Sequence, residues 1–293
     1  MKLKLIALAA MLAAGSAQAK IADSNDNGNT SSGDMFASLV SVSNNASYTV
    51  DLGLRLDQFT AASALVNADG VKLVWDLDGG TFSDLSSVST GLGAQMQMLN
   101  YGSVYSTFAT AAVVGATDLK FDVRAMDGLP TSFASAGANR YLSTSAAASI
   151  TATNGQVFAM DIADAYPTAA NADVTNSTHG AALNTAGANM FDAGDASNVY
   201  FQNGGDNWTG ATSFTSTGST SNKLSFYALT NSSTTAASQA TVVKYAGVWS
   251  FDAATAQLSY ATAAAVPEAE TYAMMLAGLG LVGFMVSRRR KLA

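Results

Sequence analysis

The chain has 293 residues, of which 48% are apolar and only 12% are charged. It has no cysteine and a single histidine, which excludes disulfide frameworks, thiolate metal sites and any site that needs two imidazoles from this chain. The net charge of −7 argues against nucleic acid as a partner, because contacts to phosphates require clustered Lys and Arg.

The charges are distributed unevenly along the chain. Six of the 14 basic residues lie at the extreme ends, namely Lys2, Lys4, Arg288, Arg289, Arg290 and Lys291. The stretch from residue 20 to residue 266 holds eight basic residues and 19 aspartates, with no glutamate, and so has a net charge of −11. The sequence therefore describes an acidic body between two apolar, basic-flanked ends.

Residues 1–19 have the three regions of a secretory signal peptide in order. Lys2 and Lys4 form a positive start, Leu5–Ala14 is apolar, and Ala17 and Ala19 form an A-x-A cleavage site. We therefore predict that the protein is exported through the inner membrane and that the body begins at residue 20.

The body, residues 20–265, has the pattern of short strands separated by polar loops. Apolar and polar residues alternate with a period of two, which is typical of half-buried strands, and turn residues such as Asp78-Gly79-Gly80 follow them. The predicted strands are Tyr48–Leu56, Val71–Leu77, Leu119–Arg124, Val157–Ile162, Val199–Phe201, Leu224–Leu229, Val243–Phe251 and Gln257–Tyr260. The last two are expected to form a hairpin across Asp252–Ala256.

This pattern predicts an all-β fold, an antiparallel β-sandwich whose topology, jelly-roll or immunoglobulin-like, is left open. Only Ala61–Val66 and the Ala/Met stretch near residues 93–99 suggest helices within the body.

A calcium-loop spacing occurs at the start of the body. Asp23, Asn25, Asn27 and Gly28 are followed by Asp34 at position twelve, which fits D-x-N-x-N-G-x5-D and resembles the loops of dockerins. The alternative is a polar N-terminal segment without a bound ion, because no helix precedes the loop and no second copy is visible.

Two further patterns bear on ligand binding. Asp76 and Asp78 are spaced to present both carboxylates on one face at a strand end, where they either bind a cation or remain solvated turn residues. Trp208 lies in a polar, glycine-rich loop and is the candidate sugar-binding residue, whereas Trp75 and Trp249 lie on alternating runs and are expected in the core.

The C-terminal end carries a second apolar segment. Residues 272–286 contain no charge and are followed by the basic tail Arg288–Lys291. Fifteen helical residues span about 22 Å, which is short of a bilayer core of about 30 Å but is extended by flanking residues. We predict a single membrane helix with the basic tail in the cytoplasm.

Residues 266–293 resemble the PEP-CTERM sorting signal, which has a Pro-Glu-Pro motif, a short membrane helix and a basic tail. The motif residues are Val266, Pro267, Glu268, Ala269 and Glu270, with Ala269 where the family has its second Pro. The resemblance is confined to about the last 25 residues. It implies processing by an exosortase, a membrane transpeptidase, in a bacterium that makes exopolysaccharide.

The function that we expect is that of an exported cell-surface or exopolysaccharide-matrix structural protein, without enzymatic activity and without a required cofactor. Its expected partners are an exosortase-like transpeptidase, the inner membrane and an exopolysaccharide, and tail removal leaves it at the surface, in the outer matrix or secreted. One alternative is a carbohydrate-binding surface module, with or without calcium. The other is a secreted glycoside hydrolase, which needs two placed carboxylates that no motif marks here.

Overall fold

The computed structural model describes residues 33–41, 44, 46–92, 102–112, 119–127, 135–159, 181–184 and 218–263. These residues form an all-β fold in which every strand pair is antiparallel. Four short helices accompany the described strands: α2 (Leu56–Ala61), α3 (Ser63–Val66), α4 (Gly102–Ala111) and α5 (Asn154–Ala159).

The described strands belong to one hydrogen-bonded sheet of eleven. Their order is β4-β3-β11-β10-β9-β6-β5-β1-β2-β7, with β8 paired to β5 off this path. The strands are β1 (Asp34–Ser41), β2 (Ala46–Arg55), β3 (Lys72–Asp76), β4 (Thr81–Asp84), β5 (Leu119–Asp127), β6 (Arg140–Ser145), β7 (Ala181–Asn184), β8 (Gly218–Ser219), β9 (Leu224–Thr230), β10 (Thr241–Asp252) and β11 (Gln257–Ala261).

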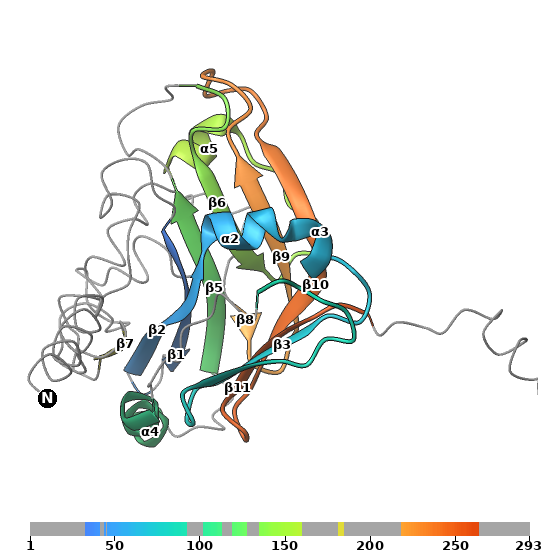
Figure 1. The fold of residues 1–293 in the computed structure, drawn as a ribbon. Coiled ribbons are helices and arrows are strands. Elements are labelled where there is room, and N and C mark those ends of the chain that lie inside the picture. Colours follow the sequence, from blue (N-terminus) through green and yellow to red (C-terminus); the bar gives the residue numbers. More distant parts are fainter. Residues whose placement is uncertain are drawn as a thin grey trace, which may run out of the picture.

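The sheet curls into a half-barrel, so that strands distant in the sheet order approach each other (Figure 1). The indole Nε1 of Trp75, on β3, donates a hydrogen bond of 3.0 Å to the carbonyl of Leu52, on β2. Residues 52–54 of β2 have no partner on β1 because the pairing register shifts there. The described strands share one continuous ladder, so the antiparallel all-β class is confirmed and the two-sheet sandwich expected from the sequence is not.

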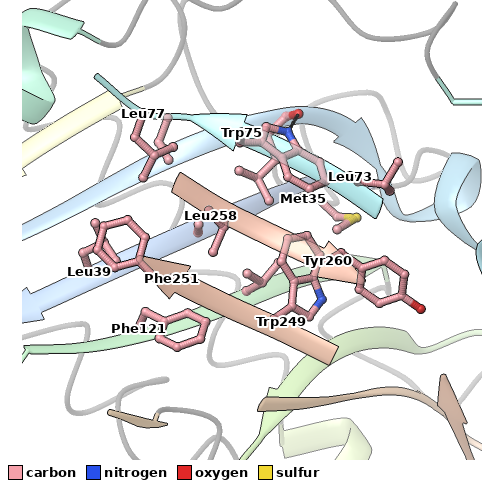
Figure 2. Packing of buried hydrophobic residues seen from close by; sticks show 14 of the residues in the cluster. Met35, Leu39, Leu73, Trp75, Leu77, Phe121, Trp249, Phe251, Leu258 and Tyr260 are labelled. Atoms are coloured by element: carbon pink, nitrogen blue, oxygen red, sulfur yellow. Dashed lines mark hydrogen bonds between the residues drawn. The ribbon is translucent and has the colours of Figure 1, made fainter. Parts of the chain in front are cut away.

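The concave side of the sheet holds an aromatic core. Trp75 and Trp249 are both fully buried, and their ring centroids lie 5.2 Å apart (Figure 2). Tyr260 packs on Trp249 at 5.4 Å, and Phe59 of α2 packs on Tyr260 at 5.5 Å. Burial of such side chains supplies the main driving force for folding, about 25 cal/mol per Å² of apolar surface. The prediction that Trp75 and Trp249 are core residues is confirmed.

Helices α2 and α3 lie across this concave side (Figure 1). Leu56 and Phe59 of α2 are buried, one helical turn apart, and Val66 of α3 joins the same core. The side chain of Gln58 caps the start of α2 by accepting a hydrogen bond of 2.8 Å from the backbone N–H of Arg55.

The opposite side of β1, β2, β5 and β6 is also buried, and it carries polar as well as apolar side chains. An ion pair between Arg124 and Asp122 lies on β5 with both side chains essentially inaccessible to solvent. The hydroxyls of Ser38 and Thr49 hydrogen-bond across β1 and β2 at 3.1 Å. The sequence had suggested that β5 is half-buried with these charges toward solvent, so that part of the prediction is wrong: β5 is buried on both sides.

Most predicted strands are confirmed, including the hairpin of β10 and β11. The predicted strand at Val157–Ile162 is wrong in its described part, because Asn154–Ala159 is a helix in which Val157 is buried. The expected strand Val199–Phe201, the helix near residues 93–99, the signal peptide with Ala17 and Ala19, and residues 266–293 lie outside the described residues. Within the described residues, no helix has the length and apolar character needed to cross a membrane.

Candidate functional site

Two features of the body merit attention as functional sites: the point where the chain leaves the fold at its C-terminal end, and an acidic hollow beside α4. The first begins with β11, which is paired on one side with β10 and on the other with β3. The last strand of the body is therefore an interior strand of the sheet and not an edge.

The two residues after β11 are tied to the turn that precedes β3. The hydroxyl of Thr262 donates to the carbonyl of Ala68 at 2.8 Å and accepts from the N–H of Val71 at 3.0 Å. The N–H of Thr262 donates to the carbonyl of Val71 at 3.1 Å, and the N–H of Gly70 donates to the carbonyl of Ala263 at 2.7 Å. We call these five residues the exit clamp. They hold the chain to the fold as far as Ala263.

The acidic hollow is an open cavity of about 280 Å³. It adjoins α4, which lies at the lower end of the molecule in Figure 1. It lies between α4, the turn after β3 and the turn that joins β10 to β11. Its lining residues are Asp78, Tyr105, Ser106, Ala109, Ala253, Ala254, Thr255 and Ala256.

Tyr105 is the most unusual residue of the hollow. Its side chain is only 3% exposed, and its hydroxyl has no hydrogen-bond partner. Burial, together with the negative charges of Asp78, Asp252 and Asp76, raises the pKa of Tyr105 to about 12. The Tyr105 hydroxyl is therefore neutral at ordinary pH and lies near three negatively charged carboxylates.

The three carboxylates have no cationic side chain within 4.0 Å among the described residues. Asp76 accepts from the N–H groups of Asp78 and Gly79 at 3.1 and 2.8 Å, and Asp252 accepts from Ala254 at 2.9 Å. The prediction that Asp76 and Asp78 are turn residues agrees with these bonds. Across the described ranges, no group of three or more Asp, Glu, His or Cys is arranged to hold a metal ion.

Only one residue of the predicted calcium loop can be placed. Asp34 begins β1, and its carboxylate lies 4.0 Å from the guanidinium of Arg55. Burial raises the pKa of Asp51 well above its usual value, and the nearby charge of Asp34 adds to this effect. Asp23, Asn25 and Asn27 lie outside the described residues, as does Trp208, so calcium binding there and sugar binding at Trp208 stay predictions.

Sequence reasoning did not identify Thr262 as a site residue, and it considered Tyr105 only as one of several aromatic residues that could form a platform for sugar rings. Tyr105 lies on α4, a helix without a polar or apolar pattern strong enough to be noticed, and Thr262 is one of many threonines. Asp252 was placed correctly in the hairpin turn, but its closeness to Tyr105 depends on the curl of the sheet.

The fold and the exit clamp define an all-β domain whose described C-terminal part ends at Ala263, which is still hydrogen-bonded to the body. Residues 265–291, which begin two residues later, match the family described as the PEP-CTERM protein-sorting motif. The resemblance drawn from Val266–Glu270 and from the basic tail Arg288–Lys291 is thereby confirmed. The chain carries the sorting signal of exported surface proteins that an exosortase, a membrane protein, processes. No curated protein and no solved structure matches the chain.

Proposed function

We propose that the protein is a structural component of the cell surface or of an exopolysaccharide matrix, delivered there as a folded β domain after an exosortase removes its tail. The observation that carries the proposal is the position of the exit clamp. The last clamped residue, Ala263, precedes Pro267 by four residues, which span at most about 14 Å.

This spacing separates the fold from the processing signal. A cut near Pro267 breaks none of the clamp's hydrogen bonds and removes no strand, so the released domain keeps its whole described core. Pro267 also disfavours a helix that runs back toward the body, because it lacks an N–H and restricts Val266 to extended conformations. An extended segment next to a finished domain is a suitable substrate for a transpeptidase.

The proposal assigns no catalytic role to the body. The described aspartates at the strand ends serve the turns in which they lie: besides Asp76 and Asp252, the carboxylate of Asp84 accepts from the N–H of Ser86 at 3.0 Å and from the hydroxyl of Thr90 at 2.6 Å. A glycoside hydrolase instead needs a pair of carboxylates that face each other across a substrate cleft.

The test is the intact mass of the protein recovered from its native host, measured separately in membrane, matrix and medium fractions. We expect a chain that begins at Lys20 and ends near Pro267, associated with the polysaccharide of the matrix. Pro267→Ala should hold the protein in the membrane fraction with its tail intact, whereas Ala269→Pro, which restores the family's second Pro, should process at least as well as wild type.

Two outcomes would contradict different parts of the proposal. Wild-type protein found only in membranes with Arg288–Lys291 intact would refute processing by an exosortase. A correctly shortened protein found only as a free monomer in the medium would leave the sorting intact and refute the structural role in a matrix.

A further inference from the structure

Exposed apolar side chains gather around the exit clamp. Among the described residues, four large apolar side chains are exposed, namely Leu65, Leu85, Val88 and Val243. The first three lie in segments that are joined to the clamp, and we call these three residues the exit surface. Single exposed apolar residues need no explanation, but a group of them often marks a site of interaction with a protein or a membrane.

Backbone hydrogen bonds place two of these side chains next to the departing chain. The N–H of Gly70 donates to the carbonyl of Ala263 at 2.7 Å, and the carbonyl of Gly70 accepts from the N–H of Ser87 at 2.9 Å. Gly70 thus lies between Ala263 and Ser87. Leu85, which is 58% exposed, and Val88, which is 36% exposed, lie on either side of Ser87 in the sequence. Both are therefore close to the point where the chain leaves the fold.

Leu65 lies on the neighbouring segment of the same region. Its carbonyl accepts from the N–H of Ala68 at 3.2 Å, and Ala68 is itself a residue of the exit clamp. A Cβ at Gly91 would lie 3.6 Å from Cδ1 of Leu65, so the end of α3 and the segment after β4 are in contact. Leu65 is 46% exposed in spite of this contact.

The length of the remaining chain indicates what the exit surface faces. The predicted membrane segment, residues 272–286, begins nine residues after Ala263, and nine residues span at most about 32 Å. A compact domain of about 245 residues has a radius of gyration of about 18 Å and is therefore about 45 Å across. The tether is shorter than the domain is wide. It therefore favours orientations in which the exit surface is turned toward the bilayer.

The charges near the exit surface oppose such a contact only weakly. The segments 63–72 and 81–92 hold one lysine, Lys72, and two aspartates, Asp69 and Asp84. Lys72 is exposed next to Leu85, whose N–H donates to the Lys72 carbonyl at 2.8 Å. These segments are thus close to neutral, whereas residues 20–266 have a net charge of −11. Repulsion between the body and anionic lipids is correspondingly small at this surface.

We propose that the exit surface is a membrane-contact surface, which rests on the lipid headgroup region for as long as the sorting tail is attached. The tether keeps the surface at a high effective concentration near the bilayer, so a small apolar contact is sufficient to orient the body. This inference rests on the part of the proposed function in which the tail holds the exported body at the membrane. It does not depend on removal of the tail or on a role in a matrix.

The absence of cysteine from the chain allows one fluorescent label to be placed at a chosen position. Residues 20–293 carrying Ser89→Cys with an NBD label are reconstituted into vesicles of phosphatidylethanolamine and phosphatidylglycerol. Ser89 is exposed and follows Val88, so the exit surface itself stays intact. We expect NBD emission to rise severalfold on reconstitution and to be quenched by lipids that carry a headgroup-level quencher. High salt should leave the signal unchanged, because the contact is apolar.

Two controls locate the contact. The same label at Ala254→Cys should stay in water, because Ala254 is exposed in the turn before β11, at the opposite end of this strand from the clamp. Leu85→Ser combined with Val88→Ser should lower the emission of the Ser89 label to that of the Ala254 label. Val243→Ser is the matched control, since Val243 is 51% exposed but lies on β10 outside the exit surface. It should leave the emission unchanged.

Several results would overturn the proposal. Equal emission and quenching at Ser89 and Ala254 would show that the body has no preferred side toward the bilayer, and a signal that survives the double serine variant would show that the apolar residues do not cause it. A signal lost in high salt would point to Lys72 and anionic lipid instead. A signal that appears only at high protein density would identify a second copy of the chain as the partner.

The same experiment separates this proposal from the proposed function. The vesicles contain no exosortase, so the result does not depend on processing. A chain that fails to float with the vesicles would refute the membrane anchor and this inference with it. An anchored chain whose Ser89 label stays in water would refute the membrane contact alone and leave the sorting and the removal of the tail unaffected.

Discussion

Trp75 and Trp249 show how two neighbouring, equally buried residues of one type contribute differently to stability. Both side chains are fully buried and their rings are in contact. The indole N–H of Trp75 reaches the carbonyl of Leu52, which the register shift of β2 has released from the ladder. The indole N–H of Trp249 has no partner among the described contacts. The two residues therefore provide a natural matched pair.

We predict that Trp75→Phe destabilises the protein more than Trp249→Phe does. Both changes remove similar volume, but the first also leaves the buried carbonyl of Leu52 without a donor, which costs about 1–3 kcal/mol. The second removes a donor that was already unsatisfied. Urea denaturation followed by circular dichroism measures both losses in the free energy of unfolding, and equal losses would show that the bond to Leu52 contributes nothing.

The ring of Tyr260 lies so close to the backbone of residue 247 that only glycine fits at this position. A Cβ at this position would lie 2.1 Å from the ring of Tyr260, and the N–H of Gly247 donates to the Tyr260 hydroxyl at 3.1 Å. That hydroxyl in turn donates to the carbonyl of Val66 at 3.3 Å. The glycine thus permits one tyrosine to connect β10, β11 and the end of α3.

At the scale of the secondary-structure elements, the exit clamp predicts a sharp boundary for truncation. A chain that ends at Ala263 keeps all the clamp's hydrogen bonds, so its thermal unfolding midpoint should equal that of the longer chain. A chain that ends at Ala256 lacks β11, exposes the ladders of β3 and β10, and should not fold. Thermal melts of the two truncated chains, each with residues 1–19 removed, test this directly.

A substitution of Thr262 tests the exit clamp without shortening the chain, and its effect should lie between those of the two truncations. Thr262→Val keeps the shape of the side chain but loses the hydroxyl's bonds to Ala68 and Val71, and so should destabilise the domain by about 1–3 kcal/mol. Thr255→Val, an exposed threonine of the neighbouring hairpin, is the control. A midpoint unchanged by Thr262→Val would mean that the clamp does not hold the end of the fold.

Most strands that the sequence predicted correctly carry polar residues on one side. Alternation identifies β2, β3, β5, β10 and β11, and it does so even in β2 and β5, where the polar side is itself buried. It fails for β1 and β6, where Phe36, Val40, Ser143 and Ser145 are all buried on the side away from the aromatic core. The outer side of these two strands mixes apolar residues with serine, so their sequences show no regular alternation, and the buried serines resemble loop residues.

The candidate sites were predictable to different degrees for the same physical reason. The sorting signal is contiguous, so residues 266–291 could be recognised without a fold. The acidic hollow joins Asp78, Tyr105 and Thr255, which are brought together only by the curl of the sheet. The exit clamp likewise joins residues 68–71 to residues 262 and 263 through a strand pairing that no local pattern reveals.

At the scale of the whole molecule, the core contains several tyrosines whose ionisation opposes folding. Burial raises the pKa of Tyr245 to about 12, as it does for Tyr105. Burial raises the pKa of Tyr260 further than that of Tyr245, and it raises the pKa of Tyr48 as well. In the unfolded chain these hydroxyls ionise near pH 10.

The protein should therefore lose stability as the pH rises from 10 to 12. Below pH 10 the tyrosines are protonated in both states and contribute no pH dependence. Above it the unfolded chain releases protons that the folded chain retains, so the free energy of unfolding falls by up to about 1.4 kcal/mol per pH unit for each such tyrosine. Urea midpoints between pH 9 and pH 11.5 measure the slope.

Tyr245→Phe isolates one contribution, because lysines also titrate in this range and cancel in the difference between the two proteins. The variant should lose less stability between pH 10 and pH 12 than wild type does. Identical slopes, or a tyrosinate absorbance near pH 10 that wild type shows and the variant lacks while both proteins stay folded, would contradict the assignment.

The interior position of β11 has a consequence for the order of events during export. If the chain crosses the membrane from its N-terminal end, β3 emerges long before β11, its neighbour in the sheet. Leu73 of β3 cannot pair with Tyr260 of β11 until that strand has also crossed. Pairings between such distant segments form slowly, and an unpaired strand edge invites association with other chains. The described sheet can be completed only when residue 261 has crossed, so β3 and β10 lack the strand that lies between them until export of the body is nearly finished.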